Sequence, residues 1–399
     1  MRVLSINCPQ DLKQVMQELK VDPYGIKIMW PKSFVYLVKI NSLAAIAANI
    51  LKQQMLSLGG DVALPRDALT GKLKQSDCLL IGNLAQYHRL NNKLKAQPFG
   101  LNKLAAELSK GLAYYQKDNF VLKAGKYRLN LKRRPHIMGV LNLTPDSFSG
   151  DGLYKYQISK NQDYIIEYAQ KLAQTGADIL DLGGESSRPQ AKPVSLKEEL
   201  NRTIPVIKKL AKRLDIPISI DTYKPEVAKQ ALDNGAVILN DITGLENSRM
   251  RKIAAQYKAA VIIMHMQGLP RNMQNNPLYQ SPVDEIIAFL AKQIESAQEA
   301  GIDRDKIVVD PGIGFGKTLA HNLEILKKLC EFKILGRPIL IGPSRKSFIG
   351  KILNIGPEKR LNGTLSACIL AVKGGAHILR VHDVSPVYES LKVAQAILN

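Results

Sequence analysis

Short apolar runs recur eight times between residues 137 and 384, and each of them ends in polar residues. Because the runs are continuous rather than alternating, they are typical of strands that are buried on both faces. The intervals between them read mostly as helices, so the pattern predicts a parallel (β/α)8 TIM barrel of the α/β class. The eight runs are Met138–Leu143, Ile179–Leu182, Ile216–Ile220, Val237–Leu239, Val261–Met264, Ile307–Val309, Ile339–Ile341 and Ile378–Leu379.

Signals for helix ends lie in the intervals between these runs. Ser195 followed by Glu198 has the spacing of a capping box, in which each side chain accepts a backbone N–H of the other residue. Pro225 and Pro282 each open a helix, and Gly301 ends the second of them, as proline and glycine commonly do. These signals support an alternation of strands and helices.

The segment before the barrel mixes both periodicities and predicts a smaller α/β domain over residues 1–118. Gly59-Gly60 follows a helical pattern and precedes an extended one, so a turn at a helix end explains it better than a phosphate-binding loop. Extended patterns cover Phe34–Ile40, Asp61–Leu64 and Cys78–Ile81, and helical patterns cover Leu43–Leu58 and the runs from Leu84 and Leu101.

Residues 119–399 are predicted to form the barrel domain, which a hairpin precedes. Asn119–Leu131 has the pattern of two short strands with Gly125 at the turn. We expect this hairpin to lie across the closed lower end of the barrel, with the domain boundary near Asp118.

Charge is distributed unevenly along the 399 residues. The net charge is +21, and residues 1–134 hold 22 basic against 8 acidic residues, while the rest hold 34 against 27. A basic excess can attract nucleic acid or anionic substrates. Here the lysines are spaced singly and few aromatic residues lie among them, so a solvated surface is favoured and nucleic-acid binding is not expected. The amino-terminal domain could instead be a dimerisation element.

Composition indicates an ordinary globular protein. Hydrophobic residues make up 45% of the chain, and no stretch approaches the roughly 18 apolar residues of a membrane span. The first ten residues do not resemble a secretory leader, so we expect a cytoplasmic protein without a membrane partner. Four cysteines lie far apart and are interpreted as buried or bystander thiols: Cys8, Cys78, Cys330 and Cys368.

The polar residues after the first strand have an unusual composition. Asn142–Gly152 combines small polar residues with a proline and two glycines, which allow a loop to turn and to fold over a ligand. In a parallel barrel the ends of all eight strands meet at one rim, where such barrels carry their active sites. We therefore expect a binding site at this rim.

Eight motifs, in order along residues 119–399, together resemble dihydropteroate synthase. A glycine-rich loop such as Gly312–Gly316 is weak evidence alone, but the ordered set is specific. The motifs are Met138–Ser149, Asp181–Pro189, Ser219–Thr222, Asn240–Ile242, Met264–Gly268, Asp310–Lys317, Ser344–Ser347 and Arg380–His382. The resemblance implies a transferase of folate biosynthesis that joins p-aminobenzoate to 6-hydroxymethyl-7,8-dihydropterin diphosphate and releases pyrophosphate.

The resemblance also implies a pterin site, and the chemistry of the residues fits it. A carboxylate in a dry barrel can accept two adjacent N–H groups of a pterin edge, as Asp221 and Asp310 are placed to do. Asn240 can donate and accept, and Lys346 offers a cation. Alternatively, Asp310 before Pro311 caps a turn. The expected pterin-binding residues are Asp221, Asn240, Met264, Asp310, Phe315 and Lys346, and the expected catalytic residues are Asp221, Asp310, Lys346 and Arg380.

The leaving diphosphate requires positive charge. Arg380 and His382 lie on one face of the last strand, and Arg188 comes from the second loop, although His382 could simply be a buried histidine. The resemblance implies that Asn142 binds Mg²⁺ beside the diphosphate, which suits an ion that needs few protein ligands. We expect stabilisation of the departing charge to be mainly electrostatic.

The arylamine is expected to dock between the first two loops and the seventh. The residues implied are Phe148, Ser187, Arg188, Pro189 and Ser347, with Lys346 adjacent. Ser187 stands where the family usually has threonine, and Pro343 stands where a less rigid residue is common, so altered contact with the arylamine is expected.

Two other enzymes on a barrel of this kind are possible. A metal-dependent hydrolase could use Asp221, His265, Asp310 and His382 as ligands, but it would usually carry a His-x-His pair where this chain has Leu141-Asn142-Leu143. A pterin-binding methyltransferase would not need the Ser344–Ser347 loop or the Arg380–His382 strand. The expected partners are small-molecule substrates and a second copy of the chain in a homodimer.

Overall fold

The computed structural model describes residues 1–399 except 5, 7–8, 133, 145–161, 187–192 and 399. The chain divides into two compact units, Met1–Ala113 and Tyr114–Asn399. The division falls inside helix α6 (Leu101–Tyr115), shortly before the boundary that the sequence suggests at Asp118.

The first unit contains a three-stranded antiparallel sheet with helices packed on it. Its strands are β1 (Val35–Ala44), β2 (Asp61–Ala63) and β3 (Gln75–Asn83), in the order β1-β3-β2. Its helices are α1 (Pro9–Glu18), α2 (Pro23–Met29), η1 (Trp30–Lys32), α3 (Ala45–Leu56), α4 (Arg66–Leu69), α5 (Leu84–Leu94) and α6. Leu51 and Met55 of α3 pack with Leu80 of β3 and Leu90 of α5 in its core.

Most of the predicted elements of this unit are confirmed, including the turn at Gly59, whose φ is +77°. Helices α1 and α2 were not predicted. The start of α2 carries a readable signal, because the Asp22 side chain accepts the N–H groups of Tyr24 and Gly25 and proline follows at the first helical position.

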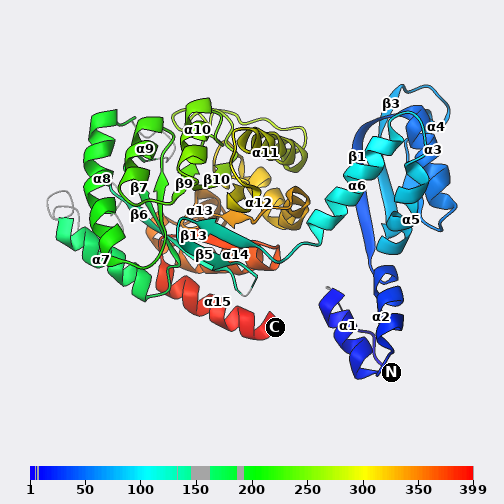
Figure 1. Ribbon diagram of the computed structural model, residues 1–399, viewed down its shortest axis with the longest axis horizontal. Helices are drawn as coiled ribbons and strands as arrows, with labels where there is room; N and C mark the ends of the chain where they lie inside the picture. Colours follow the sequence, from blue (N-terminus) through cyan, green and yellow to red (C-terminus); the bar gives the residue numbers. More distant parts are fainter. Residues whose placement is uncertain (5, 7–8, 133, 145–161, 187–192, 399) are drawn as a thin grey trace. The chain divides into compact units, whose positions relative to one another are not determined.

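The second unit contains the predicted barrel. In Figure 1 its strands lie inside a layer of helices. The eight parallel strands run in the order β11-β10-β9-β8-β7-β6-β13-β12, and a parallel bridge between Val309 and Ile339 joins the two ends of the sheet. The strands are β6 (His136–Asn142), β7 (Ile179–Gly183), β8 (Ile218–Asp221), β9 (Ile238–Asp241), β10 (Ala260–Met264), β11 (Ile307–Asp310), β12 (Leu340–Ile341) and β13 (Ile378–Val381).

Helices follow the strands and pack around them. They are α7 (Gln162–Gln174), α8 (Leu196–Arg213), α9 (Pro225–Asp233), α10 (Ser248–Gln256), α11 (Pro282–Glu299), α12 (Leu319–Lys327), α13 (Ser347–Leu353), α14 (Leu361–Lys373) and α15 (Val384–Leu398), with short turns η2 (Arg304–Lys306), η3 (Leu329–Leu335) and η4 (Pro357–Lys359). The predicted starts at Pro225 and Pro282 and the stop at Gly301 are confirmed. The capping box at Ser195 is only half formed, because the Glu198 carboxylate pairs with Arg202.

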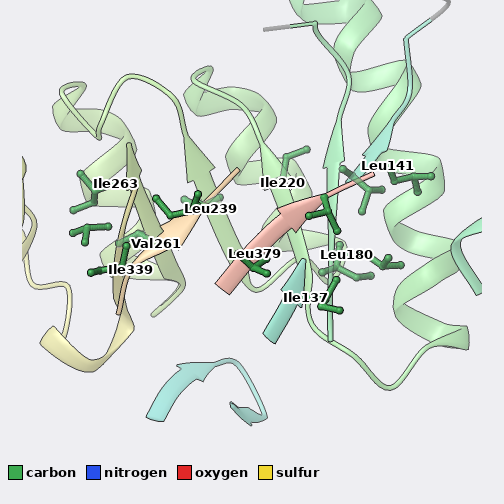
Figure 2. Packing of buried hydrophobic residues seen from close by; sticks show 14 of the residues in the cluster. Ile137, Leu141, Leu180, Ile220, Leu239, Val261, Ile263, Ile339 and Leu379 are labelled. Atoms are coloured by element: carbon green, nitrogen blue, oxygen red, sulfur yellow. The ribbon is translucent and has the colours of Figure 1, made fainter. Parts of the chain in front are cut away.

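Alternation along the strands creates two apolar layers. Ile137, Leu141 and Leu180 pack with buried residues of the surrounding helices (Figure 2), whereas Met138 and Ile179 belong to a separate cluster inside the barrel. Successive side chains of a strand point to opposite faces, so one apolar run serves both layers. This explains why the runs in the sequence are continuous.

The predicted hairpin covers the lower end of the barrel. Strands β4 (Val121–Ala124) and β5 (Tyr127–Asn130) pair antiparallel around Gly125. Leu122 and Phe120 pack against Ile238 and Ile378, which begin strands β9 and β13. The end of the barrel at which the strands begin is therefore closed, and the opposite rim is left for chemistry. Among the described helices, none is long and apolar enough to cross a membrane.

Candidate active site

Polar residues at the carboxyl ends of the strands line one pocket in the barrel. Aspartates 221 and 310 end strands β8 and β11, and Asn240 lies in β9 between them. The lining residues are Val140, Asp221, Asn240, Ile242, Met264, Asp310, Ile313, Phe315, Gly342, Ser344, Lys346, Arg380 and His382.

An arginine bridges two carboxylates on one side of this pocket. Arg380 of β13 donates from Nε to Asp181 Oδ2 and from Nη2 to Asp221 Oδ2, both at 2.6 Å. Asn240 Nδ2 donates to the same Asp181 oxygen at 3.1 Å. Asp181 is fully buried in β7. Four strands thus contribute to one hydrogen-bonded group.

Burial sets the protonation of this group. It raises the pKa of Asp221 to about 7, even though the Arg380 guanidinium opposes that rise. Burial also disfavours the charged form of Arg380, but Asp181 and Asp221 outweigh it and raise the arginine's pKa. Arg380 therefore stays charged, while Asp221 titrates near neutrality.

The second carboxylate of the pocket, Asp310, ends β11, three strands along the barrel from β8. Asp310 Oδ1 accepts the backbone N–H of Gly312 at 2.7 Å. Burial raises the pKa of Asp310 to about 6, and the Gly312 N–H, Lys346 and Lys317 hold it back from rising further. Near pH 7 this carboxylate is mostly ionised and can accept hydrogen bonds from a ligand.

A glycine-rich loop after β11 forms the adjacent wall. Gly312 has a φ of +72°, and a Cβ on it would lie 1.9 Å from the His265 carbonyl oxygen, so a side chain is excluded there. The loop places the buried Phe315 ring beneath the Lys346 ammonium, with 3.9 Å between Nζ and the ring centroid. This is the distance of a cation–π contact. A flat ligand in the pocket would meet both an aromatic face and a cation.

The last two strands complete the rim. Ser344 Oγ lies 3.1 Å from His382 Nδ1 and accepts the His382 backbone N–H at 3.3 Å. Arg345, which follows, makes a two-point ion pair with Asp383 at 2.9 and 2.6 Å. Paired hydrogen bonds of this kind fix orientation as well as charge. They hold the loop after β12 against the end of β13.

Known proteins with this sequence pattern share this architecture. Residues 138–382 match the family model described as "Pterin binding enzyme". The chain is 44% identical to the dihydropteroate synthase of Escherichia coli over 265 residues, which cover 66% of this chain and 92% of the relative. It is 46% identical to the enzyme of Synechocystis over 278 residues, 69% of this chain and 94% of the relative. The chain belongs to the dihydropteroate synthase family.

Solved structures agree with this assignment. The dihydropteroate synthase of Yersinia pestis in a sulfonamide complex matches with a TM-score of 0.66 and 41% identity, over 70% of this chain and 99% of that one. The enzyme from Thermus thermophilus in complex with 4-aminobenzoate matches with a TM-score of 0.61 and 41% identity, over 69% of this chain and 99% of that one.

The amino-terminal unit lies within a further match. A probable bifunctional folylpolyglutamate synthase/dihydropteroate synthase of Halobacterium salinarum is 37% identical over 390 residues, which cover 97% of this chain and 46% of that protein. A segment before the barrel is therefore shared with this relative, whereas the bacterial relatives match about the length of the barrel alone.

The structure brings most of the sequence-predicted site residues together. All six residues predicted to bind the pterin line the pocket, with Arg380 and His382. Asn142 ends β6 beside Gly183, and Ser347 begins α13, but neither belongs to the pocket formed by the described residues. Phe148, Ser187, Arg188 and Pro189 lie outside the described residues.

Two polar clusters near the pocket were missed from the sequence. Asp181 received no role, although a carboxylate within the apolar run Ile179–Leu182 is itself a signal. The second group is centred on Lys224, which pairs with Glu185 and with Glu199 at 2.5 Å and donates to the Val194 carbonyl at 2.8 Å. It ties the segment after β8 to both flanks of residues 187–192. Its members are far apart in the chain, so the sequence carries no signal for it.

The contacts of the alternative metal ligands argue against a hydrolase. Asp221 pairs with Arg380, and His265 Nδ1 lies 3.0 Å from the Lys317 ammonium nitrogen. A cation beside each of these groups repels a metal ion. Among the described residues, no set of three or more His, Cys, Asp or Glu side chains is arranged to hold a metal.

Proposed function

We propose that this enzyme joins the amino group of p-aminobenzoate to the methylene carbon of 6-hydroxymethyl-7,8-dihydropterin diphosphate. The carbon–oxygen bond to the diphosphate breaks, a carbon–nitrogen bond forms, and the amine proton is released with pyrophosphate. The observation that carries this proposal is the convergence of Asp221, Asn240, Asp310 and Lys346 on one pocket.

Pterin recognition follows from the donors and acceptors in that pocket. The pterin edge presents neighbouring amine and ring N–H donors, and a buried carboxylate can accept two of them. Asp310 and Asp221 are both placed for this, and Asn240 supplies an amide between them. Phe315 and Met264 offer apolar contact to the flat ring, and Lys346 a cation for its carbonyl or ring nitrogen.

Departure of the diphosphate leaves positive charge shared between the methylene and the electron-rich dihydropterin. We infer that bond breaking runs ahead of amine attack and that the surrounding charges, rather than a strong base, lower the barrier. Arg380 supplies positive charge on one side of the pocket, His382 beside it can offer a ring N–H donor, and Arg188 is proposed to add charge from the second loop. No side chain needs to act as a nucleophile.

Magnesium is proposed to bind through Asn142. The amide is half-buried at the end of β6 and offers a hard oxygen donor, which suits an ion that keeps several waters and binds substrate phosphate oxygens. When bound, the ion would neutralise diphosphate charge. The residues predicted to contact the arylamine stay predictions: Phe148, Ser187, Arg188, Pro189 and Ser347. The 4-aminobenzoate bound in the Thermus thermophilus structure supports the kind of ligand, but not these individual contacts.

A direct test is incubation of the purified protein with the pterin diphosphate, p-aminobenzoate and Mg²⁺, followed by mass detection of dihydropteroate. Omission of each component in turn is the control. Absence of the condensed product under all conditions would refute the proposal, and tightly held stoichiometric zinc would favour the hydrolase. A homodimer and a cytoplasmic location also stay predictions, of which analytical ultracentrifugation tests the first.

A further inference from the structure

Lys317 is a buried lysine that none of the roles above uses. Its side chain is 3% exposed at the end of the glycine-rich loop. The ammonium nitrogen lies 3.0 Å from His265 Nδ1, 3.3 Å from the His265 carbonyl oxygen and 2.9 Å from the Phe315 carbonyl oxygen. An ammonium group has three N–H donors, and three acceptors surround it here.

The histidine in this group is arranged as an acceptor. Burial, followed by the charge of Lys317, lowers the pKa of His265 to about 3, so the ring is neutral. The Phe289 ring packs against it in a T-shaped contact at 5.0 Å, and the Tyr279 ring lies tilted beside it at 6.0 Å, both measured between centroids. A neutral, fixed imidazole with a free Nδ1 lone pair can accept from the lysine.

These contacts join two walls of the pterin pocket. His265 follows Met264 at the end of β10, and Phe315 belongs to the loop after β11, so one ammonium links the two segments. The loop has further tethers, since Tyr279 Oη donates to the Gly316 carbonyl at 2.9 Å and Gln274 Nε2 donates to the Gly314 carbonyl at 2.7 Å. Lys317 differs from these because it also brings a charge.

That charge acts on the pterin carboxylate. Lys317 and Lys346 both favour the ionised form of Asp310, against its burial. In return, burial lowers the pKa of Lys317 to about 7, which Asp310 opposes and Lys346 reinforces. The charged and titratable groups facing Lys317 are therefore Asp310, Lys346 and His265, from the ends of three neighbouring strands.

We propose that Lys317 is a positioning residue for pterin recognition, which fixes Phe315 against the end of β10 and keeps Asp310 ionised without touching the substrate. The proposal rests on the function proposed above. It extends the pterin site to a residue that lies behind the pocket wall.

The test measures binding of 6-hydroxymethylpterin by calorimetry across pH 5.5–8.5. Lys317→Met is expected to bind about tenfold more weakly at pH 7, because the loop loses its tether and Asp310 a neighbouring cation. The acid limb of the binding profile, which is the pH range over which pterin affinity falls on acidification, should move to higher pH. Lys317→Arg, which keeps the charge, should restore the position of that limb, while the KM for p-aminobenzoate stays nearly unchanged in each folded variant.

Two further variants separate tethering from charge. Tyr279→Phe removes another tether of the same loop and should weaken binding without moving the acid limb. Lys317→Gln keeps a donor for the Phe315 carbonyl but loses the charge, and it serves as the readout if Lys317→Met does not fold. Lys306→Met is the matched control, since Lys306 is also largely buried but pairs with Asp303 just before β11 begins.

The outcomes are distinguishable. If the wild type does not bind the pterin, the proposed function fails. If the wild type binds and Lys317→Met or Lys317→Gln binds equally well with an unmoved acid limb, the role of Lys317 is refuted.

Discussion

Replacing Asp221 with asparagine tests the pterin site most directly. The Asp221 carboxylate is nearly buried and lies 2.6 Å from Arg380 Nη2. The change keeps the shape of the side chain but removes its charge and replaces one acceptor oxygen by an NH2 donor. A hydrogen bond to a charged group contributes about 2 kcal/mol in a buried site. We expect Asp221→Asn to weaken pterin affinity by this amount, which is roughly a 30-fold rise in Kd.

The pH dependence sharpens this prediction. Burial raises the pKa of Asp221 to about 7, so in the wild type the fraction of ionised Asp221 falls as the pH drops through 7. Its contribution to pterin affinity should fall with it. The asparagine variant cannot titrate, so the part of the pH profile centred near 7 should be lost.

The assay is calorimetric titration with 6-hydroxymethylpterin between pH 6 and 8.5. Asp233→Asn is the control, because Asp233 is also an ion-paired aspartate of the barrel unit, 3.0 Å from Lys229, but lies at the end of α9 away from the pocket. Thermal denaturation of both variants shows whether folding is retained. An Asp221→Asn protein that folds and binds the pterin with unchanged Kd would refute the assignment.

Three other predictions follow from the described contacts. Arg380→Ala should weaken binding of the diphosphate-bearing pterin more than that of the free hydroxymethyl pterin, and equal effects on both ligands would place the anion site elsewhere. The same change should lower the free energy of unfolding by about 3 kcal/mol or more in thermal denaturation, because Asp181 and Asp221 stay buried without their cation. Deletion of residues 1–113 should leave a folded barrel with measurable transfer activity, and an insoluble or inactive product would show that the first unit completes the fold or the site. Burial lowers the pKa of His377 to about 4, so as the pH falls the His377 ring is protonated in the unfolded chain before it is protonated in the folded one. This histidine should therefore lower the free energy of unfolding by about 3 kcal/mol between pH 6.5 and 4. Urea denaturation should show a smaller fall for His377→Gln than for the wild type, and an equal fall would contradict the assignment to His377.

The strands of the barrel could be predicted from the spacing of apolar residues along the chain. Runs such as Ile179–Leu182 are buried on both faces, and this is why each strand of the barrel could be located to within a few residues. Helix ends were readable where proline or glycine marks them. The capping box at Ser195 was only half right, because Arg202 lies one turn from Glu198 and competes for its carboxylate.

Pocket membership was predictable for a similar reason. In a parallel barrel every strand ends at the same rim, so Asp221, Asn240 and Asp310 had to lie near one another once the strands were known. The sequence by itself determined the barrel, the rim and the types of side chain gathered there.

Only the tertiary structure decided which of these groups pair. Arg380 bonds to Asp181 and Asp221, and Lys317 bonds to His265, in each case between segments that are distant in the chain. Pairing of this kind depends on side-chain geometry and on burial. A charged side chain inside the barrel is costly without a partner, so it pairs with a group that lies within hydrogen-bonding distance. Sequence periodicity fixes the face on which a residue lies, but distances of a few ångströms between strands arise only when the barrel closes.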